Sequence, residues 1–506
     1  MGLKNFLLIP VAAFAFACTG KNETTSPSTT PYTLSLAMAR TSETALGPFR
    51  VTVTLEDSGQ RLSGQTLAVT VDRGTAGAVT DNGDGTYSFT VTPSATGTHT
   101  VTVSFGGASI VRKAVVLDAY VAGSGQPMAI PGDYVNTSGY EDGVTITPDG
   151  EYLFVQYGPI HMSGVLSFSS ICSSGSYSGG YDLNTCAGRT NSSLVFDTVG
   201  PMAAPQRPDF PLGGISNGKL LHLPNVVLAG VYNGIVGFPT AFYGFKRQAD
   251  GTFAEPFKVA FNDERGLNGP FGLSFKPNGD GTATFIVAWN NYFNDLGDDG
   301  ADVYTGTLTF GQAKNLGDVT YSGGIYSAIS PNITPVSFSS HTGVQGNPHL
   351  YYDTSGTVKS IWTDDEVTAH DLSVYRLTAG TFPSGTWTKD TLPSVINTAG
   401  DENQPFFTGD ALIFRRASSI VSHAYRPTNG ACGSTYTHND CWGPEVVLLG
   451  SNGHTGVGEI FTVGEPTIAT REGKRYLYFV YIESRENPNV AGTYDWNAQA
   501  ASVEIP

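Results

Sequence analysis

Residues 141–154 read EDGVTITPDGEYLF, and related phrases recur further along the chain. Residues 401–414 read DENQPFFTGDALIF, and residues 464–479 read GEPTIATREGKRYLYF. Each phrase carries an acid or an amide at its start, continues as a strand, passes through a polar turn and ends in a β-branched or aromatic strand. A unit that repeats in this way predicts sheets stacked around an axis.

Three further stretches resemble this unit, at residues 268–289, residues 347–362 and, more weakly, residues 207–223. Together with the first three phrases they make six candidate units, and their spacing suits four-stranded blades. We therefore expect a six-bladed β-propeller at residues 120–506, with five or seven blades left open because the copies diverge.

Three shorter phrases support the repeat, at residues 302–304, 314–317 and 392–397. With them the chain resembles TolB-like, WD-type propeller repeats. The resemblance implies an exported propeller that binds a partner, and it implies no particular chemistry.

The segment from residue 32 to residue 119 alternates between apolar and polar residues, as in residues 49–55, which read FRVTVTL. Frequent turn signals in this segment predict a sandwich of about seven short strands. The phrase GDGTY at residues 83–87, with the strands that follow it, resembles filamin-type and invasin-type immunoglobulin-like domains. That resemblance implies a spacer or an adhesive stalk.

The composition agrees with an all-β chain. Only 14% of the 506 residues are charged, 62 are glycine, and no amphipathic helical stretch follows the first eighteen residues. Such a mix suits many short strands joined by glycine-rich turns. The formal net charge of −17 repels phosphate backbones, so we expect no nucleic-acid partner.

The N-terminus reads as an export signal at residues 1–18. Lys4 supplies a positive charge, and residues 6–16 form an apolar stretch too short to span a bilayer. The stretch ends at Cys18 in a phrase that resembles a bacterial lipobox, which implies that Cys18 is lipidated. Ordinary signal-peptidase cleavage after Ala17 is the alternative.

The residues after the cysteine bear on location. Residue Thr19 is not aspartate, and in Gram-negative lipoproteins this resemblance implies sorting to the outer membrane. Residues 19–31 lack apolar periodicity and read as a flexible tether. We expect a membrane partner through the N-terminal lipid, with the face of the membrane left open.

Four cysteines remain once Cys18 is set aside, and they fall into two close pairs. An exported protein oxidises such pairs, so we expect the disulfides Cys172–Cys186 and Cys432–Cys441. A metal site made of the four thiolates is the weaker alternative, because neither pair has the short spacing of zinc knuckles.

The start of each innermost strand of a propeller points to one mouth of the central channel. That rule predicts a cluster of polar residues, from which we select Asp142, Asp209, His349, Asp401, Glu402 and Glu465 as binding candidates. Paired carboxylates in a channel can act as acid and base, and five-bladed glycosidases place theirs on successive blades in this manner. We favour the alternative that the opening acid holds adjacent blades together, because it recurs in nearly every unit.

One acidic loop could bind calcium. It carries four carboxylates beside two glycines, and these are Asp295, Asp298, Asp299 and Asp302. Calcium prefers oxygen ligands, but the spacing differs from that of the EF-hand loop. We favour a solvated acidic turn and expect no other cofactor.

Four aromatic residues at strand ends could stack on sugars, and these are Tyr157, Trp289, Tyr292 and Trp362. Packing between blades is the commoner use of such residues, and we favour it.

These patterns favour an exported, membrane-anchored lipoprotein whose propeller binds an envelope or extracellular partner, either protein, peptidoglycan or polysaccharide. The competing hypothesis is a glycan-active enzyme, a hydrolase or a lyase, that uses the channel carboxylates. A purely structural envelope protein is the third.

Overall fold

The structure is a computed structural model of the 506-residue chain. It describes residues 31–132, 134–137, 139–158, 215–216, 219–220, 241–263, 270–289, 301–322, 325–329, 332–338, 345–364, 371–428, 432–433, 435–486 and 494–506. Within these ranges the regular structure is β-strand, apart from short 3₁₀ turns at residues 432–433 and at Asn439–Cys441. None of these residues belongs to a helix with the length and hydropathy needed to cross a membrane. The expected all-β class is confirmed.

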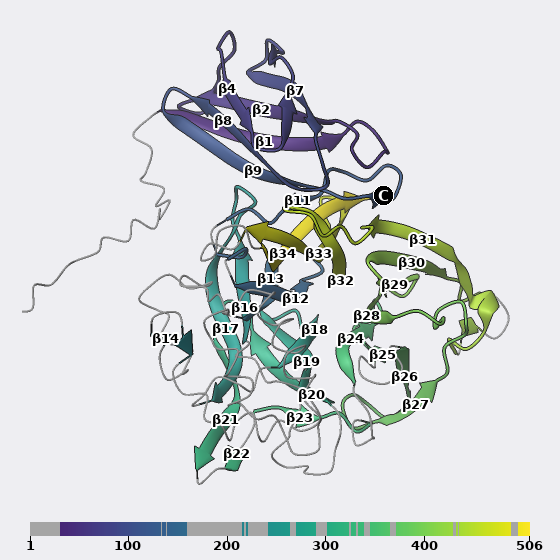
Figure 1. Ribbon diagram of the computed structural model, residues 1–506. Coiled ribbons are helices and arrows are strands. Elements are labelled where there is room, and N and C mark those ends of the chain that lie inside the picture. Colours follow the sequence, from purple (N-terminus) through teal and green to yellow (C-terminus); the bar gives the residue numbers. More distant parts are fainter. Residues whose placement is uncertain are drawn as a thin grey trace, which may run out of the picture.

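The N-terminal domain is a sandwich of two antiparallel sheets (Figure 1). One sheet contains β1 (Tyr32–Arg40), β2 (Phe49–Asp57), β7 (Thr86–Pro93) and β5 (Gly74–Ala76), with β3 (Gln60–Arg61) beside β2 and β6 (Thr80–Asp81) beside β7. The facing strands are β4 (Ala68–Val71), β8 (Gly97–Phe105) and β9 (Ala108–Val116). Alternation along β2 buries Phe49, Val51, Val53 and Leu55 completely between the sheets. This is the expected immunoglobulin-like fold.

The described residues after the sandwich form five blades, each a sheet whose first four strands run outward from a common centre. Blade 1 has β12 (Tyr140–Ile146), β13 (Tyr152–Gly158), β16 (Ala241–Arg247) and β17 (Phe253–Asp263), followed at its outer edge by β21 (Lys314–Ser322) and β22 (Ile325–Ile329). Blade 2 has β18 (Phe271–Pro277), β19 (Thr282–Trp289), β20 (Asp302–Thr309) and β23 (Thr334–Pro335). Blade 3 has β24 (Gly346–Tyr352), β25 (Val358–Asp364), β26 (Leu372–Ala379) and β27 (Thr386–Asp390).

Blade 4 has β28 (Glu402–Phe407), β29 (Ala411–Arg416), β30 (Ser419–Tyr425) and β31 (Trp442–Gly450). Blade 5 has β32 (Ile460–Arg471), β33 (Lys474–Glu486) and β34 (Tyr494–Ile505), and its fourth strand is β11 (Met128–Ala129). The innermost strands β12, β18, β24, β28 and β32 contact one another in turn, and β32 contacts β12, so the ring is closed (Figure 1).

The hydrophobic core follows the same symmetry. Each pair of adjacent blades encloses one apolar cluster, and a sixth cluster fills the sandwich. Phe154 of blade 1 packs with Phe275 of blade 2, for example, with ring centroids 5.0 Å apart. Burial between blades therefore holds the ring together.

The ring has five blades, the lower of the numbers that the sequence left open, and not six. The weak unit at residues 207–223 falls between β13 and β16, and these two strands pair directly with each other. Its described residues form the hairpin of β14 (Ile215–Ser216) and β15 (Lys219–Leu220), a separate two-stranded sheet that is not one of the five blades. The repeated phrase spans one hairpin, which any insertion can also produce, so counting phrases overestimates the number of blades.

The segment between the two domains closes the propeller. β10 (Ala119–Tyr120) adds to the outer edge of blade 4, and β11 pairs with β34 in blade 5. β11 also pairs with β9 of the sandwich through Met128 and Ala114. Blade 5 and half of the sandwich thus form one seven-stranded sheet, in the order β32-β33-β34-β11-β9-β8-β4 (Figure 1).

Polar contacts reinforce this junction. The Thr98 backbone N–H and hydroxyl each donate to the Glu483 carboxylate at 2.7 Å, and Arg73 Nη1 lies 3.7 Å from the same group. Glu483 is buried. The sandwich is consequently fixed to blade 5 by shared backbone and side-chain bonds, unlike a stalk on a flexible hinge.

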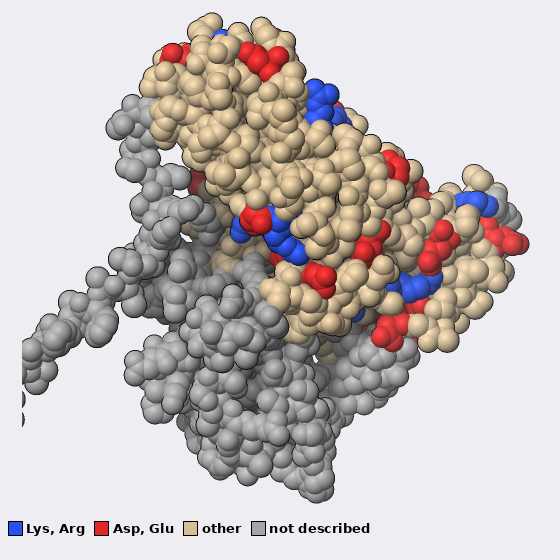
Figure 2. Space-filling view, turned by 45° about the horizontal axis from the view of Figure 1, so that its top comes forward, with Lys and Arg blue, Asp and Glu red and all other residues tan. Residues whose placement is uncertain are grey.

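The surface of the described part carries few charges. On the face shown in Figure 2, lysine, arginine, aspartate and glutamate side chains lie scattered among uncharged residues, with no broad field of one sign.

Candidate functional site at the channel mouth

Each innermost strand is interrupted by a β-bulge at the same level of the channel. One residue of each bulge has a φ between 39° and 57°, and these are Gly143, Gly272, Asn347, Gln404 and Glu465. Glycine adopts this left-handed conformation freely, whereas the other three residue types adopt it rarely. A bulge re-aims the side chain of its extra residue. The acid-or-amide phrase in the sequence is therefore associated with a bulge in every blade.

The bulges line a narrow channel of about 40 Å³ along the axis. Three consecutive residues of every innermost strand contribute, and these are residues 143–145, 272–274, 347–349, 404–406 and 465–467. Pockets for small ligands usually measure about 300–1,000 Å³. A sugar or a peptide therefore has to bind at the mouth and not inside the channel.

Charged side chains from four blades surround this mouth. Asp142 lies on β12 and Glu465 on β32, and both are partly exposed. Asp364 ends β25 and is fully buried, and Arg415 comes from β29. Because the second strand of a blade runs antiparallel to the first, its end returns to the level where the first begins. Three carboxylates and one guanidinium group thus gather from strands far apart in the sequence.

A row of hydrogen bonds joins three of the blades at the mouth. The Asn347 side-chain amide and the Gln404 backbone N–H donate to Asp364 Oδ2, at 3.0 and 2.6 Å. The Gln404 side-chain amide donates to Glu465 Oε1 at 2.5 Å, and its oxygen accepts from the Glu465 backbone N–H at 3.0 Å. The bulge residues therefore connect blades 3, 4 and 5 and hold two carboxylates in fixed positions.

Asp142 has a different environment. Its side chain is partly exposed but largely enclosed by protein, and this burial raises the pKa of its carboxyl group. The Gly143 backbone N–H and the positive charge of Arg415 act in the opposite direction without reversing the shift. A carboxyl group whose pKa is raised in a partly open site is suited to proton transfer.

Two glycines make room for charged side chains at the mouth. A Cβ atom on Gly346 would stand 2.3 Å from Asp364 Oδ1, and one on Gly464 would stand 2.5 Å from Gln404 Oε1. The same Cβ on Gly464 would lie 3.2 Å from Arg415 Cδ. Asp142 and Asn403 occupy the equivalent positions in blades 1 and 4.

Two opening acids are buried in structural roles. The Thr137 backbone N–H and hydroxyl donate to Glu141 at 2.9 and 2.5 Å. The Thr398 backbone N–H and hydroxyl donate to Glu402 in the same way, at 3.0 and 2.5 Å, and Arg416 Nε lies 3.0 Å from Glu402. Both carboxylates are fully buried and fasten the loop that enters the innermost strand. For Glu402 this geometry fits the loop-fastening role and not an open site.

The remaining channel candidates differ from one another. His349 lines the channel, its Nε2 donates to the Phe407 carbonyl at 2.9 Å, and burial lowers its pKa to about 4. His349 is therefore neutral, and its ring packs against that of Phe406 with ring centroids 4.3 Å apart. Asp401 is exposed beside the mouth. Asp209 lies outside the described residues.

The acidic loop contributes one described carboxylate, that of Asp302, which begins β20. Its other three members, Asp295, Asp298 and Asp299, lie outside the described residues. Within the described ranges, no three histidine, cysteine, aspartate or glutamate residues are placed to hold a metal ion.

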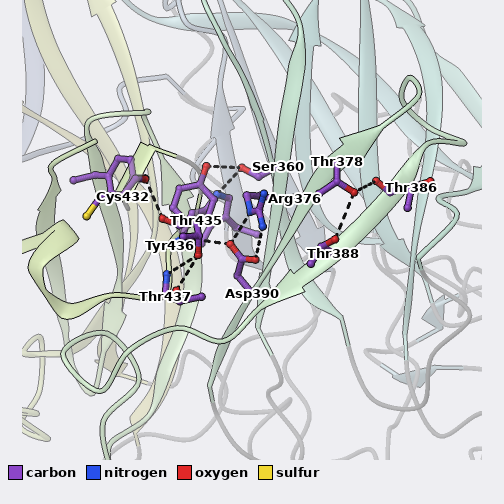
Figure 3. Close-up of polar contacts among 12 residues, drawn as sticks. Ser360, Arg376, Thr378, Thr386, Thr388, Asp390, Cys432, Thr435, Tyr436 and Thr437 are labelled. Carbon is purple, nitrogen blue, oxygen red and sulfur yellow. Dashed lines mark hydrogen bonds and ion pairs between the residues drawn. The ribbon is translucent and has the colours of Figure 1, made fainter. Parts of the chain in front are cut away.

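The structure contains the disulfide Cys432–Cys441, and its loop joins blade 4 to blade 3 (Figure 3). The Tyr436 backbone N–H of this loop donates to Asp390 Oδ2 at 3.2 Å. Arg376 forms a two-pronged ion pair with Asp390, at 2.7 and 2.9 Å. Cys172 and Cys186 lie outside the described residues, as do Cys18 and the tether at residues 19–30.

The aromatic residues at the strand ends pack between blades. Trp289 of blade 2 stacks on Phe261 of blade 1 at 4.3 Å, and Trp362 of blade 3 packs on Phe407 of blade 4 at 4.8 Å. Both tryptophans are fully buried, and Tyr157 is 1% exposed, so none of the three can stack on a sugar. Tyr292 lies outside the described residues.

Sequence reasoning missed Asp364, Arg415 and Gln404. The first two stand at the end of a blade's second strand, and one signal was present, because residues 363–366 read TDDE and residues 415–416 read RR directly after apolar strands. Gln404 was not selected because it is uncharged and stands close to Asp401 and Glu402, which were selected.

Comparison with known proteins adds a family match at the N-terminus. The family model described as invasin, domain 3, matches residues 35–123. No curated protein sequence matches the chain.

Several solved structures are similar to part of this chain. A protein titled glycoside hydrolase is 8% identical, with a TM-score of 0.35, covering 74% of this chain and 92% of its own. A GH43 β-xylosidase/α-arabinofuranosidase from a compost microbial metagenome, in complex with xylotriose, is 7% identical, with a TM-score of 0.33, covering 73% and 94%. A family 117 glycoside hydrolase from the marine bacterium Zobellia galactanivorans is 8% identical, with a TM-score of 0.33, covering 75% and 89%.

The titles of these three structures name glycoside hydrolases, and none of the three names a TolB-like protein. At such low identities and TM-scores they leave the function to be argued from the residues at the mouth. The fold itself defines the chain as a five-bladed β-propeller fused to an immunoglobulin-like domain.

Proposed function

We propose that this protein is a glycan-active enzyme of the glycoside hydrolase type, with its active site at the channel mouth. The observation that carries the proposal is the set of three carboxylates, Asp142, Asp364 and Glu465, brought from three blades to one opening around Arg415. Ring closure alone does not explain a partly exposed carboxyl group with a raised pKa beside a cation.

Glycosidic bond hydrolysis needs one carboxyl group to protonate the leaving oxygen and a second to activate water or attack the sugar. Asp142 suits the first role because burial raises the pKa of its carboxyl group while the residue remains partly exposed. Glu465 suits the second, since it is the other partly exposed carboxylate and Gln404 fixes its position. The buried Asp364 is a positioning residue that holds Asn347 and Gln404.

The test compares Asp142→Asn and Glu465→Gln with the wild type on a panel of neutral and acidic polysaccharides. Each variant is expected to lose about 100- to 10,000-fold in kcat/KM, the usual contribution of a general acid or base. The matched control is Asp401→Asn, an exposed acid beside the same mouth, which is expected to keep full activity. Full activity in both site variants would overturn the proposal. Product analysis separates hydrolysis, which leaves a new reducing end, from the elimination of a lyase.

A partner-binding propeller without turnover is the second candidate. The observation in its favour is that Gln404 engages both Asp364 and Glu465 in bonds between blades. Under this hypothesis the wild type binds a polysaccharide, peptidoglycan or envelope protein and releases no product, and Asp142→Asn leaves that binding intact.

The proposal places the enzyme in the cell envelope as an outer-membrane lipoprotein anchored through Cys18. Metabolic palmitate labelling of the wild type and of Cys18→Ala tests the anchor. Label is expected only in the wild type, and equal labelling would contradict the anchor.

A further inference from the structure

A second cavity, of about 440 Å³, lies where the outer edges of blades 2 and 3 meet, apart from the channel. Ser337 and Phe338 line it from the segment after β23, and residues of blade 3 complete it, namely Tyr375, Gly385, Thr386, Trp387 and Lys389. Its volume is in the range of pockets that hold a small ligand, about 300–1,000 Å³.

The two faces of the β26–β27 hairpin have different surroundings. Arg376 and Asp390 point to the disulfide loop of blade 4, where they meet Tyr436 (Figure 3). Tyr375 pairs with Lys389 and Leu377 with Trp387 across the hairpin, so these four residues share the other face. That face carries the cavity.

The wall of the cavity is aromatic and rigid. Phe338 stacks on Tyr375 with ring centroids 4.0 Å apart, and Trp387 meets Phe338 edge-on at 5.3 Å. The Ser337 hydroxyl donates to the Gly385 carbonyl at 2.8 Å, which ties the rim of blade 2 to the loop before β27. A preformed wall of this kind binds a flat or ring-shaped ligand at little cost in conformational entropy.

Two groups of the cavity lack the partner that their chemistry requires. The indole N–H of Trp387 is buried and has no acceptor among the described residues. Lys389 is exposed, its Nζ lies 5.7 Å from the centroid of the Tyr375 ring, and no ion pair with a described carboxylate is formed. Among the described residues that line the cavity, Lys389 alone is charged.

We propose that this cavity binds a uronic acid unit of an acidic polysaccharide. The apolar face of the sugar ring packs on the aromatic wall, and the uronate carboxylate pairs with Lys389. In a chain with a net charge of −17, an unpaired cation in an aromatic pocket selects an anionic ligand. The choice of a sugar rests on the proposed function, and the site would act as a secondary subsite that keeps the polymer near the channel mouth.

The experiment measures binding without turnover, so that its failure is distinct from failure of the active-site proposal. The protein carries Asp142→Asn and Glu465→Gln, and the indole N–H signals of its five tryptophans are followed by NMR. The signal lost in Trp387→Phe identifies Trp387. Tetramers of galacturonate, glucuronate and mannuronate are titrated, each beside its methyl-esterified form.

At least one acidic tetramer is expected to shift the Trp387 signal saturably. Its methyl ester, and the acidic form on Lys389→Met, are expected to bind about fivefold to tenfold more weakly. Lys474→Met, which removes an exposed lysine far from the cavity, is the matched control and is expected to leave affinity unchanged. No shift with any of the three tetramers would overturn the proposal, as would equal affinity for acid and ester together with an unaffected Lys389→Met variant. Because Lys389 is exposed, its variant tests the site even if Trp387→Phe does not fold.

Discussion

Arg415 of blade 4 lies against Gly464 of blade 5, and a Cβ on Gly464 would stand 3.2 Å from the Arg415 Cδ. The same Cβ would meet Gln404 Oε1 at 2.5 Å. The arginine and the amide therefore hold their positions at the mouth because this residue has no side chain.

The first prediction follows from this contact. Gly464→Ala is expected to displace Arg415 and Gln404 and to lower kcat/KM by at least about tenfold, because a shift of about 1 Å at a positioning group can cost 100-fold. Gly77→Ala in the sandwich is the control, since a Cβ there makes only ordinary contacts, the nearest at 3.4 Å. Kinetics and thermal melts of both variants provide the measurement. Unchanged kinetics in Gly464→Ala would show that the position of Arg415 does not matter.

The second prediction concerns Asp142 and pH. Burial raises the pKa of this carboxyl group above its usual 3.8, so the folded chain binds the proton more tightly than the unfolded chain. The stability it contributes is thus fully present below pH 3.8 and is lost as the pH rises through the folded pKa. Asp142→Asn is expected to be inactive, and more stable than the wild type at pH 7. The advantage should shrink towards pH 3.5.

Urea unfolding of both proteins at the two pH values measures this difference. Asp401→Asn serves as the exposed control. A stability difference that is the same at both pH values, or a less stable Asp142→Asn at pH 7, would contradict the raised pKa.

The third prediction separates structural from catalytic acids. Glu402 is fully buried and pairs with Arg416, whose side chain is 17% exposed. Breaking a buried pair by removing one partner costs about 3–5 kcal/mol, so Glu402→Ala is expected to lower the free energy of unfolding by about 3 kcal/mol. The neighbouring Asp401→Asn should change it by less than about 0.5 kcal/mol. If Glu402→Ala instead loses activity at unchanged stability, the residue acts in catalysis.

The fourth prediction tests the shared sheet. Because blade 5 continues into the sandwich and Glu483 bonds to Thr98 and Arg73, both domains of the wild type are expected to melt in one calorimetric transition. Glu483→Ala removes the two hydrogen bonds that Thr98 donates to this carboxylate and should uncouple the sandwich, which then melts at a lower temperature than the propeller. Glu504→Ala, at an exposed ion pair on the same blade, is the control. Two transitions in the wild type would show that the shared sheet does not couple the domains.

Much of the fold could be predicted from local sequence. The alternation at residues 49–55 became β2, and every strong repeat phrase became the first hairpin of a blade. The weak phrase at residues 207–223 was counted as a blade because its sequence resembles the repeat. Its described strands, β14 and β15, pair with each other in a separate two-stranded sheet. The site was less predictable. Asp142 and Glu465 belong to the repeated phrase and were among the candidates chosen from the sequence. Asp364 and Arg415 were not, because they reach the mouth from the second strands of their blades.

The sequence by itself determined the all-β class, the sandwich and the innermost hairpins of the blades, because alternation and turn residues act over a few neighbouring residues. Only the tertiary structure decided the number of blades, the continuous sheet through β11 and the composition of the mouth. Ring closure depends on how many blades fit around one axis when apolar clusters fill the space between them. The mouth likewise depends on the space that Gly346 and Gly464 leave for side chains from other strands and blades.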